Sequence, residues 1–115
     1  MTIQKRIVKS KDAPDLGVFS WSDPFYLEKQ LSEEERMLRD ASKTFAQEKL
    51  QPRITKAFQN ETVEPQLFKE MGEMGLLGTT IPEEYGGLGA GYVSYGVVAR
   101  EIERVDSGYR SMMSV

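Results

Sequence analysis

The segment from Asp106 to Ser111 combines side chains that can bind an anion, in the order Asp-Ser-Gly-Tyr-Arg-Ser. Asp106 and Ser107 are residue types that cap helices, so the segment predicts a helix that starts near Gly108. Backbone N–H groups at a helix start favour an anion, and Arg110 adds a permanent charge whose planar fork suits a carboxylate or a phosphate. The residues alone leave two interpretations open, an anion site or an ordinary capped surface helix.

The composition excludes several other kinds of catalytic and metal-binding chemistry. The 115 residues contain no His and no Cys, so thiolate nucleophiles, disulfides, zinc–cysteine sites and histidine bases are excluded, and we expect no metal site. Eighteen acidic residues against 15 basic ones give a net charge of -3, which argues against a nucleic-acid partner. No apolar run approaches the roughly 18 residues of a membrane span, so none is expected.

Two further motifs are interpreted as non-catalytic. The glycine-rich run 86–91 lacks both the spacing of a phosphate-binding loop and the strand that should precede it, so it predicts a loop with positive φ at several positions. Glu83 and Glu84 are adjacent in that loop region, and such pairs are usually exposed to solvent. Neither motif is assigned a site.

The elements that must position these residues are predicted to be all helical, four or five in number. Ser32 and Glu35 have the spacing of a capping box and open the first long helix, which should break or kink at 50–52 because of Pro52. Its apolar stripe includes Met37. A second short helix over 53–58 should turn Phe58 inward.

The second half of the chain predicts two long elements around a loop. Pro65 suits the first position of a helix, and Gly75 suits its C-terminal cap. Residues 75–91 form a glycine-rich loop, and a clean apolar stripe over 92–105 predicts the next helix, whose charged residues should all face away from the core.

The chain divides into a flexible lead, 1–20, and one helical domain, 21–115, which we expect to be truncated within its last helix. Aromatic residues after residue 20, Trp21 among them, should pin the lead by burying their rings. The basic start is interpreted as a short tail because acidic residues follow quickly, which predicts a cytoplasmic protein. If the source is eukaryotic, the expected location is the mitochondrial matrix.

Two sequence stretches resemble the acyl-CoA dehydrogenase family. Residues 70–78, EMGEMGLLG, and 81–87, IPEEYGG, resemble the family's N-terminal domain. Residues 95–115 are similar more narrowly to the members that oxidise glutaryl-CoA to crotonyl-CoA and CO2. The resemblance implies an N-terminal helical domain of a larger fold, with a middle β-domain and a C-terminal helical bundle. It also implies FAD, an acyl-CoA thioester substrate, electron-transfer flavoprotein as a partner, and a homotetramer at full length.

The resemblance assigns roles to few residues here. Arg110 would pair with the distal carboxylate of the substrate, and Ser111 would line the same pocket. The catalytic glutamate and the main flavin contacts would lie beyond Val115, so the isolated chain should hold no FAD and show no activity. The alternatives are a dehydrogenase of another acidic acyl-CoA and a free-standing helical interaction module.

Overall fold

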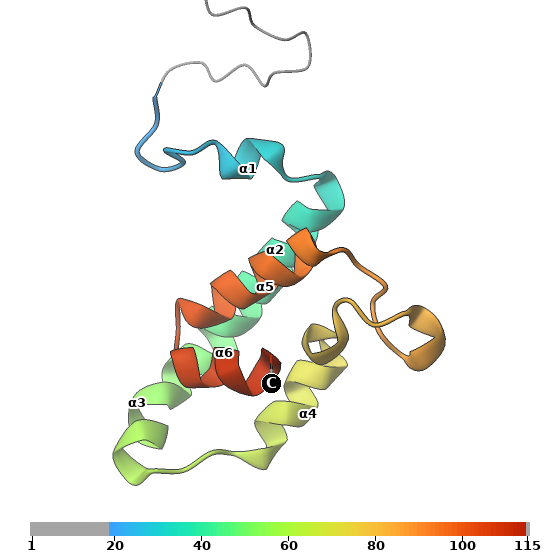
Figure 1. The fold of residues 1–115 in the computed structure, drawn as a ribbon. Helices are drawn as coiled ribbons and strands as arrows, with labels where there is room; N and C mark the ends of the chain where they lie inside the picture. Colours follow the sequence, from blue (N-terminus) through green and yellow to red (C-terminus); the bar gives the residue numbers. More distant parts are fainter. Residues whose placement is uncertain (1–18, 115) are drawn as a thin grey trace, which may run out of the picture. The chain divides into compact units, whose positions relative to one another are not determined.

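The computed structural model describes residues 19–114, and every regular element in that range is helical (Figure 1). This confirms the all-α prediction. The chain divides into two compact units between Leu31 and Ser32, and each unit is described by itself. The proposed division of the chain at residue 20 stays a prediction.

The first unit contains the short helix α1, Leu27–Gln30. Its start is fixed by Asp23, whose two carboxylate oxygens accept hydrogen bonds from the backbone N–H groups of Leu27 at 2.8 Å and Glu28 at 3.0 Å. Trp21 is 88% exposed and contacts Phe19 edge to face, with 5.0 Å between the ring centres. The prediction that Trp21 buries its ring was wrong, because its ring contact is with another exposed ring rather than with a core.

The second unit begins with one long helical run. Helix α2, Glu33–Phe45, passes through a π-helical turn, η1, Ala46–Leu50, into α3, Gln51–Asn60. Ser32 and Glu35 form the predicted capping box. The predicted interruption at 50–52 is present as a change of helix type, because α3 begins anew at Gln51 after the π-helical turn. Pro52 lies in the first turn of α3, where a missing N–H costs little.

The helices that follow α3 pack back against this long helical run. Helix α4 spans Pro65–Glu73, as Pro65 predicted, and Gly75 follows it with φ of 73°. Two single 3₁₀ turns, η2 at Leu76–Gly78 and η3 at Glu83–Tyr85, lie in the glycine-rich segment. Helix α5, Tyr92–Glu103, packs along α2, and α6, Ser107–Ser114, packs on α5 (Figure 1).

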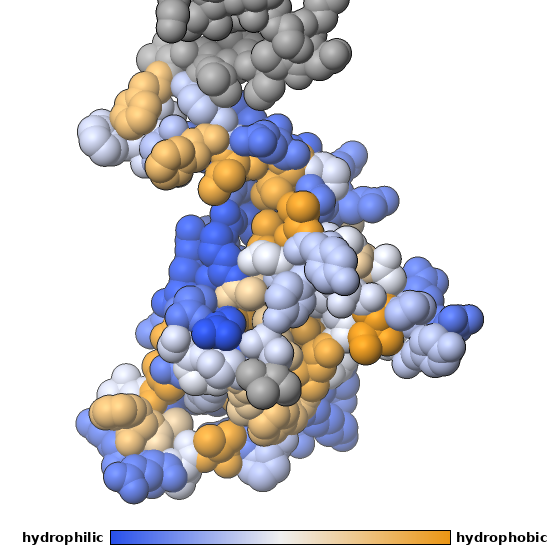
Figure 2. All heavy atoms as spheres, in the orientation of Figure 1, coloured by the Kyte–Doolittle hydropathy of each residue, from blue (hydrophilic) through white to orange (hydrophobic). Residues whose placement is uncertain are grey.

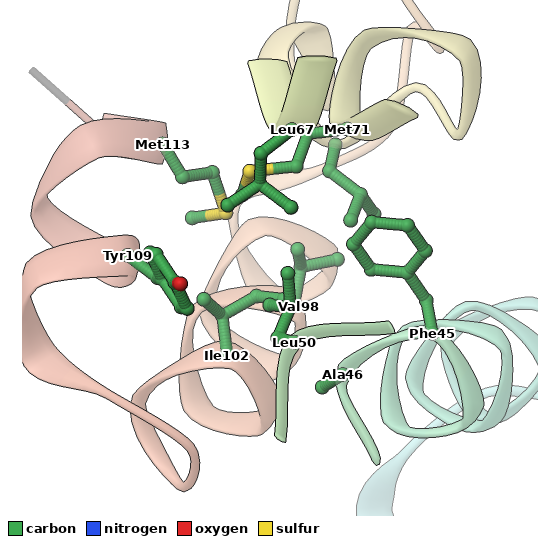
Figure 3. Close-up of a cluster of buried hydrophobic side chains, with 10 residues drawn as sticks. Phe45, Ala46, Leu50, Leu67, Met71, Val98, Ile102, Tyr109 and Met113 are labelled. Atoms are coloured by element: carbon green, nitrogen blue, oxygen red, sulfur yellow. The ribbon is translucent and has the colours of Figure 1, made fainter. Parts of the chain in front are cut away.

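The core of the second unit lies where α2, η1, α4, α5 and α6 meet. Figure 3 shows Tyr109 and Met113 of α6 pointing toward side chains of α4 and α5. The buried hydrophobic cluster consists of Phe45, Ala46, Leu50, Leu67, Met71, Leu76, Val98, Ile102, Tyr109 and Met113. Burial of apolar surface stabilises the folded state by roughly 25 cal/mol per Å². The packing of this cluster therefore fixes α6 against the rest of the unit.

Two predicted core positions lie outside the core. Met37 on α2 is 67% exposed and Phe58 on α3 is 82% exposed. Helical periodicity marks a face of a helix, but the face is buried only where another element covers it. The described elements leave both of these positions uncovered.

Candidate functional site

The candidate site is built at the junction of α5 and α6. Helix α5 ends in a tight turn, in which the N–H groups of Val105 and Asp106 both donate to the carbonyl of Ile102, at 3.0 and 3.1 Å. Asp106 then starts α6, because its Oδ1 accepts a hydrogen bond from the backbone N–H of Tyr109 at 2.9 Å. The predicted cap is therefore confirmed, and the turn brings the first residues of α6 beside the last residues of α5.

Arg110 is held by two polar side chains. Its Nε donates to Glu103 Oε2 at 2.7 Å, and its Nη1 donates to Ser114 Oγ at 3.3 Å. The other terminal nitrogen, Nη2, takes part in neither bond. The Arg110 side chain is 36% exposed, so the guanidinium lies at the surface in a fixed orientation and can meet an anion that approaches from outside the described residues.

Glu103 is the member of this cluster that sequence reasoning missed. Its Oε1 accepts a hydrogen bond from Ser107 Oγ at 2.5 Å, while its Oε2 binds Arg110. The hydrogen bond from Ser107 and then the one from Arg110 lower the pKa of the Glu103 carboxyl below 4.5. The spacings of four and seven residues could have signalled the cluster, but only if the turn between the helices had been known.

Ser111 lies on a different side of α6 from Arg110. It lines an open groove of about 1020 Å³, whereas Arg110 is not among the lining residues. The groove is mostly apolar, with Phe58, Val63, Phe68 and Met112 in its walls. Figure 2 shows apolar side chains reaching the surface at the α3–α4 end of this unit. The structure therefore does not bring Arg110 and Ser111 into one pocket within the described residues.

Tyr109 belongs to the core. Burial raises the pKa of its phenol above 10.0, and the negative charge of Asp106 acts in the same direction. Its role is to pack α6, and this packing fixes the helix that carries the neighbouring Arg110.

A second charged cluster lies on α5 and is structural. Glu101 is 2% exposed, and its carboxylate is bound by Arg100 Nε at 3.0 Å and by Arg104 Nη1 at 3.3 Å. The prediction that every charged residue of this helix faces away from the core was wrong for Glu101. A buried carboxylate is tolerated here because two guanidinium groups pair with it.

The glycine-rich segment does not form a phosphate cradle. A Cβ on Gly87 would lie 2.0 Å from the carbonyl oxygen of Ile81, so this glycine permits the backbone near residue 87 to approach the backbone near residue 81 closely. The backbone N–H groups that a phosphate would need are already bonded within the loop: Gly87 to Pro82, Leu88 to Gly78, Gly89 to Ile81 and Ala90 to Thr79. The segment is therefore a structural loop, and it does not fit the pyrophosphate of a dinucleotide cofactor. Glu83 and Glu84 are exposed, as expected.

Within residues 19–114, no three acidic side chains gather as metal ligands would. Among the helices of the same range, none is both long and apolar enough to cross a membrane.

Comparisons with known proteins agree with this architecture. Residues 32–115 match the family model described as acyl-CoA dehydrogenase, N-terminal domain. A probable acyl-CoA dehydrogenase of Bacillus subtilis, YngJ, is 38% identical over 73 residues, which is 64% of this chain and 19% of that protein.

Two solved structures are also similar. The crystal structure of glutaryl-CoA dehydrogenase from Mycobacterium smegmatis has a TM-score of 0.75 at 36% identity, over 82% of this chain and 24% of that one. A structure described as the electron transferring flavoprotein of Acidaminococcus fermentans has a TM-score of 0.70 at 33% identity, over 73% of this chain and 22% of that one.

This chain belongs to the acyl-CoA dehydrogenase family and has the fold of the family's N-terminal helical domain. It spans about a fifth to a quarter of the length of the proteins it matches. Members of the family are FAD-dependent.

Proposed function

We propose that this chain is the N-terminal domain of an FAD-dependent acyl-CoA dehydrogenase that acts on an acyl-CoA whose acyl group ends in a second carboxylate. Glutaryl-CoA is the substrate we propose, with crotonyl-CoA and CO2 as the products. The observation that carries the proposal is the orientation of Arg110, whose guanidinium is held by Glu103 and Ser114 at the start of α6.

The chemistry of Arg110 supports an acidic substrate. A guanidinium and a carboxylate form charge-assisted hydrogen bonds, and Nη2 is engaged by neither Glu103 nor Ser114. A substrate with an apolar tail would desolvate Nη2 and offer it no acceptor, which costs free energy and disfavours such a substrate. Arg110 would therefore select the substrate. Ser111 lies on the groove side of the helix and would contact the substrate only if the substrate reaches both sides of α6.

The remaining apparatus is proposed by family membership. The general-base glutamate and the FAD contacts would come from residues beyond Val115. FAD, when bound, supplies the acceptor for the hydride that leaves the substrate. The further proposals are electron-transfer flavoprotein as the electron acceptor, a homotetrameric assembly and a cytoplasmic or mitochondrial-matrix location. The similarity to a structure described as an electron transferring flavoprotein supports only the choice of partner.

The test compares two substrates that differ at one end. Glutaryl-CoA and valeryl-CoA have acyl chains of equal carbon number, and only the first ends in a carboxylate. The full-length, flavin-loaded protein should give a higher kcat/KM with glutaryl-CoA. An Arg110→Ala variant should lose about 100-fold of that preference, because the distal carboxylate of the substrate would then lack the cation that pairs with it.

Lys56→Ala is the matched control, because Lys56 is an exposed cation on α3, away from the α5–α6 junction. It should leave the preference unchanged. Equal turnover of the two substrates by the wild type would contradict the proposal. A preference that shifts to another acidic acyl-CoA, and still depends on Arg110, would establish the neighbouring alternative.

A second candidate function is a helical interaction module, and the apolar groove beside α6 favours it. It predicts a protein that binds a partner and ignores acyl-CoA thioesters. Thioester turnover that depends on Arg110 would exclude this candidate.

A further inference from the structure

Ser107 has an unusual position for a serine at the start of a helix. Such a hydroxyl commonly caps the helix, but here Asp106 performs that task through its bond to the N–H of Tyr109. The Ser107 hydroxyl instead reaches back across the turn and donates to Glu103 Oε1 at 2.5 Å. Capping therefore does not explain the contact that this side chain makes.

Glu103 needs such a contact if it is to hold Arg110 in one place. It is the last residue of α5, where the helix dipole disfavours a negative charge. The side chains of Glu103 and Arg110 are 45% and 36% exposed, and exposed ion pairs are weak because solvent screens them and both side chains move. A single bond would leave the carboxylate free to rotate.

The two bonds of Glu103 remove that freedom. Ser107 binds one carboxylate oxygen and Arg110 binds the other, so the plane of the carboxylate is fixed between two residues of α6. The lowered pKa of Glu103 agrees with this, since the hydrogen bond from Ser107 is its largest cause and keeps the carboxylate ionised.

We infer that Ser107 is a positioning residue for substrate selection: its hydroxyl orients Glu103, which in turn aims the guanidinium of Arg110 at the distal carboxylate of an acidic acyl-CoA. This inference rests on the proposed function. Ser107 touches neither Arg110 nor the substrate, and it acts through Glu103 alone.

The experiment measures KM and kcat of the full-length, flavin-loaded protein with glutaryl-CoA and with valeryl-CoA. Ser107→Ala should raise KM for glutaryl-CoA about fivefold more than KM for valeryl-CoA, roughly the effect of one ordinary hydrogen bond, because Ser107 acts through Glu103 and does not itself bind the substrate. Ser107→Thr retains the hydroxyl and should restore the wild-type ratio of the two KM values. A merely structural role would change both substrates alike and would not depend on the hydroxyl in this way.

Ser32→Ala is the matched control. It also removes a serine hydroxyl that bonds near a helix start, because Ser32 Oγ accepts from the N–H of Glu35 at 3.2 Å, but it lies at the start of α2. It should lower Tm and leave the ratio of KM values unchanged. The inference is overturned if the wild type prefers glutaryl-CoA and Ser107→Ala keeps that preference in full. A wild type without any preference would instead overturn the proposed function, so the two failures are distinguishable.

Discussion

Helix α6 has two sides that obey different physics. Tyr109 and Met113 face the core, where each is only 6% exposed, whereas Arg110 lies on a side that solvent reaches. The apolar side is held by packing, which is non-directional and depends on the area removed from water. The polar side is held by hydrogen bonds of defined geometry to Glu103 and Ser114. One side fixes where the helix lies, and the other is therefore available to bind a ligand.

The two sides also carry titrating groups whose pKa values shift in opposite directions. Burial raises the pKa of the Tyr109 phenol, because the phenolate loses hydration in the core. Hydrogen bonds lower the pKa of the exposed Glu103 carboxyl, because they stabilise its charged form. The attachment of α6 should therefore weaken at high pH through its packed side and at low pH through its polar side.

The largest expected effect comes from the packed side. Ile102 is fully buried beneath α6, so Ile102→Ala should lower the free energy of unfolding by about 2–5 kcal/mol, through lost burial and the cavity left behind. Chemical denaturation followed by circular dichroism measures this. The control Val93→Ala, on the exposed face of α5, should change it by less than about 1 kcal/mol. Equal losses at the two positions would show that the core is not where the structure places it.

A smaller effect is expected at alkaline pH from Tyr109. Because its folded-state pKa lies above the ordinary value of 10.0, its contribution to stability is complete below that pH and is lost as the pH rises through the folded-state pKa. Tyr109→Phe should remove this alkaline loss, as measured by Tm between pH 9 and pH 12 (roughly the range around the phenol pKa). Tyr92→Phe, at a highly exposed tyrosine, should leave the loss in place. An alkaline loss that survives Tyr109→Phe would assign it to other groups.

The smallest effect is expected at acid pH from Glu103, because the group is exposed. Its folded-state pKa is below 4.5, so its contribution is complete above that pH and is lost as the pH falls through the lower folded-state value. Glu103→Gln should flatten this part of the curve of Tm against pH. Glu48→Gln, at an exposed carboxylate on η1, serves as the control. If both variants flatten the curve equally, the acid loss reflects net charge rather than the Ser107–Glu103–Arg110 cluster.

Local signals in the sequence were enough to locate most helix boundaries. The capping box of Ser32 and Glu35, Pro65 at a helix start and Gly75 after a helix end each act within a few residues of themselves, and each was confirmed. The interruption predicted at 50–52 is a change from π-helical to α-helical geometry, because a proline is excluded from a helix interior but accepted in its first turn. The sequence pattern alone does not show the π-helical turn that makes position 52 a first turn.

Burial was predictable only where another element covers the helix. Phe58 lies on an apolar stripe and yet is exposed, whereas Glu101 is charged and yet is buried. Periodicity ranks the faces of one helix against each other, but it carries no information on which neighbour arrives. Glu101 tolerates burial because Arg100 and Arg104 pair with it, and such pairing depends on side-chain geometry in three dimensions.

The all-helical class, the family, and Arg110 as the cation near the start of the last described helix could all be predicted from the sequence alone. These depend on residue types and short spacings, which act locally. The hydrogen bonds from Ser107 to Glu103 and from Arg110 to Glu103, and the separate groove that Ser111 faces, follow from the three-dimensional arrangement. The physical reason is the turn after α5: a hydrogen bond needs its donor and acceptor within about 3 Å, and the fold alone brings two helix ends to that distance.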